Sequence, residues 1–372
     1  MKLDDSVYKI AFSFLKKAGA PLIRLLEEKG MEPDEFFCLP TKDLISRLGI
    51  SHTHDFDKLA REEALLTAQK EWDQIRKHNI IPLFMLDEGY PSRLSEIDEP
   101  PLVIYKLGEA PLEEEHLVAV VGTRKPSPYG LDFCNKFVND IGEYFSKAVI
   151  VSGLAYGIDA EAHKKALDKS LSTIAVVAHG LNMIYPAANR NLAKEIIKKG
   201  GAIISEYPFG VKPFKPNFLA RNRIVAGISD ATVVVESKIK GGAMSTANFA
   251  FLYNRDVMAL PGRTTDELSS GCNLLIRKNK AHLIESAADF IDITGWQPLG
   301  SPVGSQHRNL FPELEGETKV IYELLKFSSS PLQIDQIVAK SGIPVARLIA
   351  LLNELEFDGI IMRYPGNRYS IS

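Results

Sequence analysis

The sequence predicts an α/β protein built around a doubly wound, mostly parallel sheet. Between Leu117 and about Ile293, short β-branched apolar runs alternate with stretches of helical periodicity. The runs are continuous, as expected for strands that are buried on both faces, and the helical spacers between them imply βαβ units. These observations indicate a Rossmann-like domain, whose predicted strands are LVAVVG, AVIVSG, TIAVVAHG, GAIISE, ATVVVES and DVMALPG.

Residues 1–80 precede this sheet and predict a small helical domain, because their apolar positions recur at helical spacing between punctuating Gly and Pro residues. Residues 81–114 follow as a connector packed on the core. Prolines interrupt this connector, and its LVIY run predicts an extra strand near a sheet edge. The Rossmann-like domain itself is assigned to residues 115–293.

Two more segments complete the predicted organisation. Residues 294–317 are rich in Gly, Pro and Ser, which is typical of a linker. Residues 318–372 predict a winged helix, because three helical stretches precede a hairpin-like strand pair and Gly342 lies at the turn of a helix-turn-helix step. The stretches are TKVIYELLKF, LQIDQIVAKSG, IPVARLIALLNELEFDG and IIMRYPGNRYSI.

Composition narrows the possible functions. With 44 basic and 47 acidic residues the net charge is −3, so nucleic-acid binding would require a local basic surface. Cys38, Cys134 and Cys272 are widely spaced, which argues against a disulfide framework or a cysteine metal site and suits a reduced cytoplasm. The sequence has no cleavable leader pattern, and no apolar run approaches the roughly 20 residues of a membrane span. We therefore expect a soluble cytoplasmic protein without a metal site or cofactor.

The first candidate site residues follow the first predicted strand, in VAVVGTRKPSPYG. Open α/β sheets bind ligands at the carboxyl ends of their strands, where Gly122 and Thr123 expose backbone amides. Arg124 adds a planar guanidinium that can clamp a phosphate or stack on a base. The alternative is that Gly122 only turns the chain and Arg124 pairs with a surface acid.

Three other strand-end loops carry weaker signals, because their polar residues can be ordinary helix N-caps. Glycines before predicted helices can expose anion-binding amides, and Asn and Arg can line the same crevice. His163, in the first of these loops, is expected to be structural or partly exposed, since no nucleophile can be assigned beside it. The loops are VSGLAYGIDAEAHKKAL, AHGLNMIYPAANRNLAKEI and ESKIKGGAMSTANFAF.

The most informative segment is PFGVKPFKPNFLARNRIVAG, residues 208–227, which we interpret as a loop that leads into an apolar segment. Cations interleaved with aromatic rings suit a flexible, negatively charged polymer with stackable faces, that is, single-stranded nucleic acid. Phe218 is the ring expected to be exposed for stacking, whereas Phe209 and Phe214 can be buried in a core. Arg221 and Arg223 can instead hold the following helix to the sheet edge. The cations of the segment are Lys212, Lys215, Arg221 and Arg223.

Seven motifs in this order resemble those of the DNA-processing protein A family, also called DprA or Smf. The match covers residues 115–290 and extends upstream through YPSRLSEIDEPPLVIYKLG. The flanking domains agree in type with the sterile-alpha-motif-like and winged-helix domains that this family often has. The motifs are VVGTRKPSPYG, VSGLAYGIDAEAH, HGLNMIYPAANR, ISEYPFG, NFLARNRIVAG, GGAMSTA and LPGRTTDELSSGCNLLI.

The resemblance implies a homodimeric protein without catalytic activity. It would bind incoming single-stranded DNA during natural transformation, protect it and help to load the RecA recombinase onto it. The DNA contacts that the resemblance implies are Arg124, Lys215 and Phe218. The resemblance extends less directly to Gly122, Thr123, Asn222 and Arg223, which can shape the pocket rather than touch DNA. Arg221 is a further DNA-binding candidate.

Two other functions stay open. The chain could be a nucleotide- or nucleoside-processing enzyme, because similar α/β domains occur in cytokinin-activating phosphoribohydrolases, whose PGGxGTxxE loop supplies a catalytic glutamate. When Thr246 is aligned with the threonine of that loop, Phe249 stands where the glutamate should be.

A duplex-binding regulator would act through the winged helix instead. Its presumed recognition helix has Arg347, but it also has three acids, Glu354, Glu356 and Asp358. Because these acids repel phosphate, we expect an accessory or protein-contact role for this domain.

Overall fold

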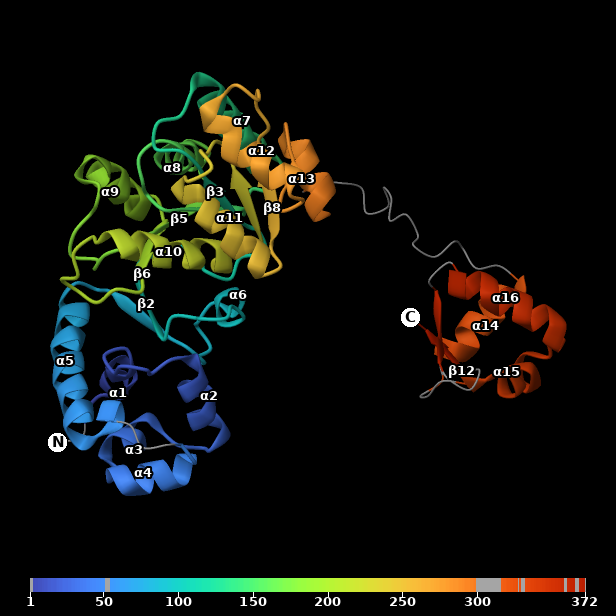
Figure 1. The fold of residues 1–372 in the computed structure, drawn as a ribbon, viewed down its shortest axis with the longest axis horizontal. Helices are drawn as coiled ribbons and strands as arrows, with labels where there is room; N and C mark the ends of the chain where they lie inside the picture. The colour runs from blue at the N-terminus through green and yellow to red at the C-terminus, as the bar shows by residue number, and fades with distance from the viewer. Residues whose placement is uncertain are drawn as a thin grey trace. The chain divides into compact units, whose positions relative to one another are not determined.

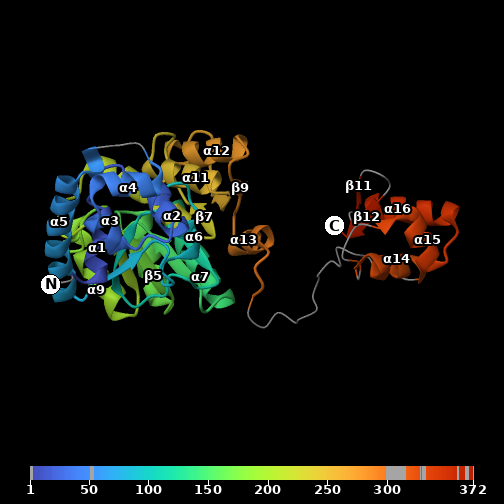
Figure 2. The same ribbon diagram turned by 90° about the horizontal axis from the view of Figure 1, so that it is seen from below.

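The computed structural model describes residues 3–50, 54–298, 316–326, 328, 332–357, 360–364 and 368–371. The chain divides into two compact units, Met1–Leu299 and Gly300–Ser372 (Figures 1 and 2). Among the described helices, none combines the length and apolar character that a membrane crossing requires.

Within the described residues of the first unit, a nine-stranded sheet has the order β1-β2-β6-β5-β4-β3-β7-β8-β9. From β3 to β9 each strand pairs in parallel with its neighbours inside this set, which confirms the predicted Rossmann-like, mostly parallel fold. The six predicted runs form β3 (Leu117–Val121), β4 (Val149–Ser152), β5 (Ser172–Val176), β6 (Ala202–Ser205), β7 (Ala231–Val234) and β8 (Asp256–Ala259). The short β9 (His282–Leu283) was not predicted.

The connector supplies two strands to one edge of the sheet. The predicted LVIY strand is β2 (Val103–Gly108), which runs antiparallel to both β6 and β1. The edge itself is β1 (Ile81–Phe84), which the sequence did not predict. Pro82 lies within β1, and proline is tolerated there because an edge strand does not need every amide for pairing.

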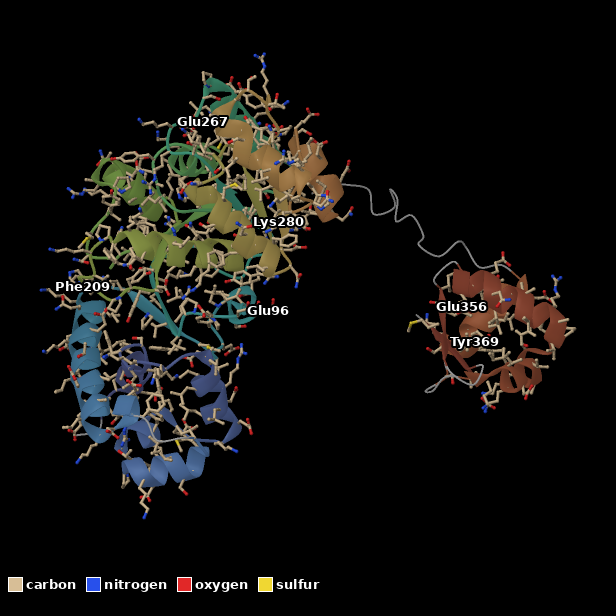
Figure 3. All side chains as sticks on the ribbon, in the orientation of Figure 1. Glu96, Phe209, Glu267, Lys280, Glu356 and Tyr369 are labelled. Atoms are coloured by element: carbon tan, nitrogen blue, oxygen red, sulfur yellow. The ribbon has the colours of Figure 1, made fainter. Side chains whose placement is uncertain are left out.

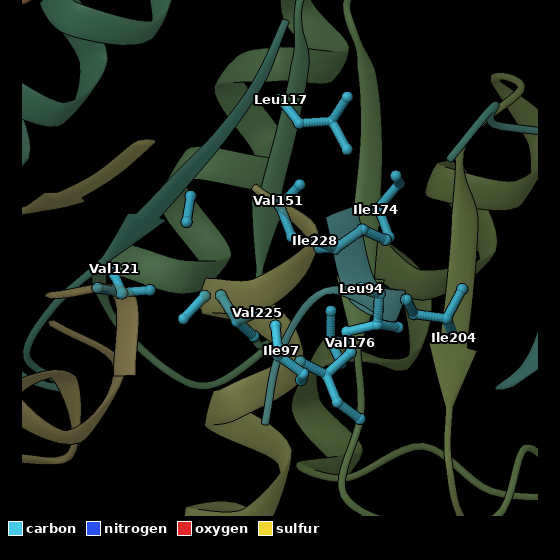
Figure 4. Packing of buried hydrophobic residues seen from close by; sticks show 14 of the residues in the cluster. Leu94, Ile97, Leu117, Val121, Val151, Ile174, Val176, Ile204, Val225 and Ile228 are labelled. Carbon is cyan, nitrogen blue, oxygen red and sulfur yellow. The ribbon is translucent and has the colours of Figure 1, made fainter. Parts of the chain in front are cut away.

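Helices cover both faces of the sheet, as a doubly wound fold requires. On one face, Val225 and Ile228 pack with strand residues such as Val151 in a continuous apolar cluster (Figure 4). The helices of this face are α10 (Lys215–Ile228), α11 (Gly242–Leu252), α12 (Ser270–Arg277) and the short α6 (Ser92–Ser95). The clusters on the opposite face involve α7 (Pro128–Tyr144), α8 (Ile158–Asp168), α9 (Arg190–Lys198) and α13 (Ala287–Thr294).

The N-terminal segment is helical in its described part, and its helices are α1 (Asp5–Phe12), α2 (Ala20–Glu28), α3 (Pro33–Cys38), α4 (Thr41–Leu48) and α5 (Lys58–Lys77). Their core contains Phe36 and Leu44 and continues into Phe84 of β1 and Tyr105 of β2. The helices and the connector therefore share one apolar core. The division at residue 80 stays a prediction.

The second unit has the predicted winged-helix elements. The three helices are α14 (Gly316–Lys326), α15 (Ile334–Ser341) and α16 (Val345–Phe357), and the hairpin consists of β11 (Ile361–Tyr364) and β12 (Arg368–Ile371). A short β10 (Leu332–Gln333) pairs with β12 as a third strand. Most of the predicted linker, residues 299–315, lies outside the described residues, as does Asp358.

His163 is a fully buried structural residue of α8. Its Nδ1 lies 2.7 Å from the hydroxyl of Thr173, which donates to the carbonyl of Ile150 at 2.7 Å. Because that hydroxyl has a single proton, Nδ1 must be the donor to it, so Nδ1 carries a proton in this contact. Burial, reinforced by the nearby Arg221 charge, lowers the pKa of His163 to about 3.

The pKa of His163 predicts a specific acid sensitivity. An unfolded histidine binds a proton below about pH 6.5, whereas the folded side chain stays neutral down to about pH 3. The unfolded state therefore binds more protons in this window, and the free energy of unfolding should fall as the pH falls from 6.5 towards 3. Near pH 5, His163→Gln should reduce this slope by about 1.4 kcal/mol per pH unit.

Denaturant unfolding of the first unit at several pH values, followed by circular dichroism, measures the slope. Exposed His282 provides the matched control, since its replacement by Gln removes a histidine that loses little hydration on folding. Equal slopes for wild type and His163→Gln would contradict the prediction.

Candidate nucleic-acid interface

A pocket of about 530 Å³ opens at the carboxyl ends of β4, β3 and β7. After β3 the chain builds β4, β5 and β6 on one side and then returns to pair β7 with the other side of β3. The pocket thus lies at the topological switch point, where open α/β sheets bind their ligands. Its lining includes the candidates Gly122, Thr123, Arg124, Lys215, Phe218, Arg221 and Asn222.

Two glycines bring the turn after β3 against the start of α8. A Cβ on Gly122 would lie 2.7 Å from Cγ1 of Ile158, and a Cβ on Gly157 would lie 2.3 Å from the carbonyl oxygen of Thr123. Gly157 also has a φ of 77°, in the left-handed region that favours glycine. Side chains at these positions would push α8 away, so the close packing that holds Arg124 at the pocket depends on both glycines.

The segment interpreted as a loop is helical from Lys215, where α10 begins with Pro216 in its first turn. Proline suits this place, because its missing N–H would be unpaired there anyway. The helix turns Lys215, Phe218 and Asn222 towards the pocket at spacings of three and four residues. A local cationic and aromatic face therefore arises from helical periodicity rather than from loop flexibility.

Phe218 is half-buried rather than exposed, and its ring lies near Arg124, which lines the pocket, and near Tyr185, which is not a lining residue. The guanidinium carbon of Arg124 lies 5.9 Å from the centre of the Phe218 ring, within cation–π range. The Phe218 ring is also 5.7 Å from the ring centre of Tyr185, at an interplanar angle of 57°. Tyr185 was not among the predicted site residues.

Arg221 acts as a buried anchor beneath the pocket. Its Nη1 donates to the carbonyl of Gly153 at 2.7 Å and to the carbonyl of Val176. A Cβ on Gly153 would lie 2.6 Å from Nη2 of Arg221, so this glycine makes room for the guanidinium. The contacts favour the alternative stated for Arg221, that it holds α10 to the ends of β4 and β5.

Asp159 is the buried acid among the lining residues, and it accepts the amides of Gly153 at 3.2 Å and Ala155 at 3.4 Å. Burial raises the pKa of its carboxyl, while Arg221 and these amides oppose that shift. Burial also lowers the pKa of Arg221, which the charge of Asp159 opposes. The two buried charges therefore compensate each other below the pocket floor.

Asn222 and Arg223 face different surroundings on α10. The Asn222 amide donates to Oγ of Ser245 at 2.7 Å, which joins α10 to the first turn of α11 at the pocket. Arg223 is absent from the lining residues and forms an ion pair of 2.6 Å with Glu206. This ion pair favours the alternative stated for Arg223, that it holds the helix in place. Here it holds α10 against the loop after β6.

The other two phenylalanines of the segment, Phe209 and Phe214, have environments that differ from each other and from that of Phe218. Phe209 packs against the helical cluster, donates its amide to Glu71 of α5 at 2.8 Å and lies 4.7 Å from the ring of His78 (Figure 3). Phe214 is 64% exposed, so the suggested core position does not apply to it. The N-terminal helices therefore hold the strap of residues 206–214, which leads directly into the pocket-lining helix α10.

The exposed charge at the pocket rim is positive. Arg124 and Lys215 are joined by Lys238 and Lys240 from the loop after β7, of which Lys238 pairs with Glu267 at 2.7 Å. Gly242, Ala243 and Ser245 place the amides of the first turn of α11 at the same pocket, where a helix N-terminus attracts anions. The two lysines were missed, although the Lys-Ile-Lys triplet after a predicted strand was a readable signal.

Comparison with known proteins covers most of the chain. Residues 82–295 match the family model described as DNA recombination-mediator protein A, and residues 309–367 match the DprA winged helix domain. Protein Smf of Synechocystis is 36% identical over a match of 318 residues, and the match covers 76% of this chain and 78% of that protein. The resemblance to the DprA or Smf family is thereby confirmed.

Two solved structures agree with the fold. The X-ray structure of DNA processing protein A from Streptococcus pneumoniae has a TM-score of 0.64 and 32% identity, covering 78% of this chain and 98% of that chain. A structure that concerns the single-stranded DNA binding mode of DNA processing protein A from Helicobacter pylori has a TM-score of 0.52 and 34% identity. The match covers 57% of this chain and 94% of that chain.

Proposed function

The chain belongs to the DNA recombination-mediator protein A family, and on this premise we propose that it binds single-stranded DNA in the pocket at the carboxyl edge of its sheet. The observation that carries the proposal is the convergence of Arg124, Lys215 and Phe218 on this one pocket from two separate segments. Phosphate recognition and base stacking require cations and a ring in the same place, and the pocket supplies both.

Each part of the pocket has a chemical task in this proposal. Arg124, Lys215 and Lys240 neutralise phosphates, and the amides at the start of α11 add donors without a counter-charge. Phe218 provides a face on which one base can stack, worth about 1–3 kcal/mol. Because these contacts address backbone charge and π-faces, the proposed binding has little sequence preference.

We propose that the chain acts without catalysis. Phe249, at the position of the phosphoribohydrolase glutamate, packs its ring 6.0 Å from that of Tyr253 at the end of α11. Asp159 is buried, and its carboxylate is occupied by backbone amides. Hydrolysis of a nucleoside monophosphate by the purified protein, above a buffer control, would instead favour the enzyme.

The cellular role completes the proposal and rests on the family resemblance. The protein would work in the cytoplasm as a homodimer, protect single-stranded DNA that enters during natural transformation and help to load RecA onto it. Of the named DNA candidates, Arg124, Lys215 and Phe218 would touch DNA. Gly122, Thr123, Arg221 and Asn222 would shape the pocket, and Arg223 would support α10 from outside it.

Replacement of Arg124 by Ala should weaken binding of a labelled oligothymidine at least tenfold, because the substitution removes a guanidinium that serves both a phosphate and the Phe218 ring. Fluorescence anisotropy across a salt series measures the affinity. The slope of log affinity against log salt should become shallower by about 0.7 for each phosphate that the variant no longer neutralises.

Lys125 is the matched control for Arg124, since it is an exposed neighbouring cation that does not line the pocket. Lys125→Ala should change the affinity far less than Arg124→Ala. Equal reductions in affinity would show that general charge, not the pocket, determines binding.

The winged helix should contribute little to single-strand affinity. Arg347, the cation of its presumed recognition helix, is ion-paired with Glu317, and Glu354 lies exposed on the same helix. A chain that ends at Leu299 keeps the whole first unit. In the same anisotropy assay it should bind oligothymidine within about threefold of the full chain, whereas a weakening comparable to that of Arg124→Ala would refute this expectation.

A further inference from the structure

We propose that Tyr185 forms a second base-stacking position beside Phe218, so that the pocket rim holds at least two bases of a single strand. The inference rests on the proposed function and specifies how that site engages its ligand. Its starting point is a ring that is 45% exposed and lies 5.7 Å, centre to centre, from the Phe218 ring.

An exposed tyrosine is ordinary on a protein surface, so its position and support carry the argument. The backbone amide of Tyr185 donates to Nε2 of His179 at 3.2 Å, and Nδ1 of His179 lies 3.0 Å from the Gly180 carbonyl. The neutral tautomer with a proton on Nδ1 satisfies both contacts, and burial of His179 lowers its pKa in favour of the neutral form.

The loop around Tyr185 is held at two other points. Oδ1 of Asn182 accepts the amide of Gly210 at 2.9 Å, which ties the loop to the strap before α10. The Asn189 amide donates to the Leu154 carbonyl at 2.9 Å, which ties it to the turn between β4 and α8. An aromatic ring on such a fixed loop is pre-organised, because little conformational freedom disappears when a base stacks on it.

The geometry assigns the two rings to different bases. Their planes differ by 57°, so one flat base cannot stack on both faces at once. Arg124, 5.9 Å from the Phe218 ring, marks the phosphate-binding side of the same cluster. A strand that follows Arg124, Phe218 and Tyr185 must therefore turn between two stacked bases, as a flexible single strand can and a base-paired duplex cannot.

Replacing Tyr185 by Ala should weaken oligothymidine binding about 5- to 140-fold, which corresponds to the loss of one stacked base. Stacking neutralises no phosphate, so the salt slope should stay that of wild type, in contrast to Arg124→Ala. Tyr185→Phe keeps the ring face and should bind like wild type. Circular dichroism of each variant checks that the fold is kept.

An abasic scan of the oligomer tests the same proposal from the side of the DNA. Removing single bases in turn should weaken binding to wild type at two positions and binding to Tyr185→Ala at one. A penalty at only one position for wild type, an unchanged affinity of Tyr185→Ala, or an equal weakening for Tyr185→Phe would overturn the second stacking position. None of these three results contradicts the proposed single-stranded DNA binding if Arg124→Ala still weakens binding. If the wild-type protein shows no salt-sensitive binding of the oligomer, both the proposed function and the second stacking position are overturned.

Discussion

The pocket depends on one buried interaction, the contact of the Arg221 guanidinium with the carbonyls that end β4 and β5. A buried cation without partners is costly, and breaking a buried ion pair destabilises a protein by about 3–5 kcal/mol. The charge of Asp159 compensates that of Arg221, and the absence of a side chain at Gly153 makes room for the guanidinium. This contact fixes the rotation and depth of α10 on the sheet. The positions of Lys215, Phe218 and Asn222 follow from it, since they share the helix face above the anchor.

The same arrangement explains how a chain with a net charge of −3 offers a cationic site. The chain needs no overall excess of basic residues, because strand-end loops that are distant in sequence meet at the switch point of the sheet. One turn brings Arg124, the helix α10 brings Lys215, and the loop after β7 brings Lys240. The N-terminal helices act on this site indirectly, through the contact of Glu71 with the strap that precedes α10.

Sequence patterns predicted the parts of the fold that follow from burial. Continuous apolar runs marked all six central strands, since strands covered on both faces exclude polar residues. The edge strand β1 was missed because Pro82 lowers strand propensity and an edge tolerates it. The start of α10 was missed because the prolines and aromatic rings before it resemble a loop. All site candidates except Arg223 line the pocket. Arg221 and Arg223 have different roles because they lie on different faces of α10. Residue spacing alone does not show which of these faces meets the sheet. Tyr185 carried no distinguishing pattern.

Photo-crosslinking would test the central claim most directly, namely that single-stranded DNA lies over α10 and the turn after β3. Single thymines of an oligothymidine are replaced by 5-iodouracil, the complex is irradiated, and the crosslinked peptides are identified by mass spectrometry. The account predicts a crosslink to the peptide that contains Phe218, and its disappearance when excess unlabelled oligomer competes. The proposed second stacking position adds a crosslink to the peptide that contains Tyr185. Crosslinks confined to residues 316–371, or spread evenly over the surface without competition, would contradict it.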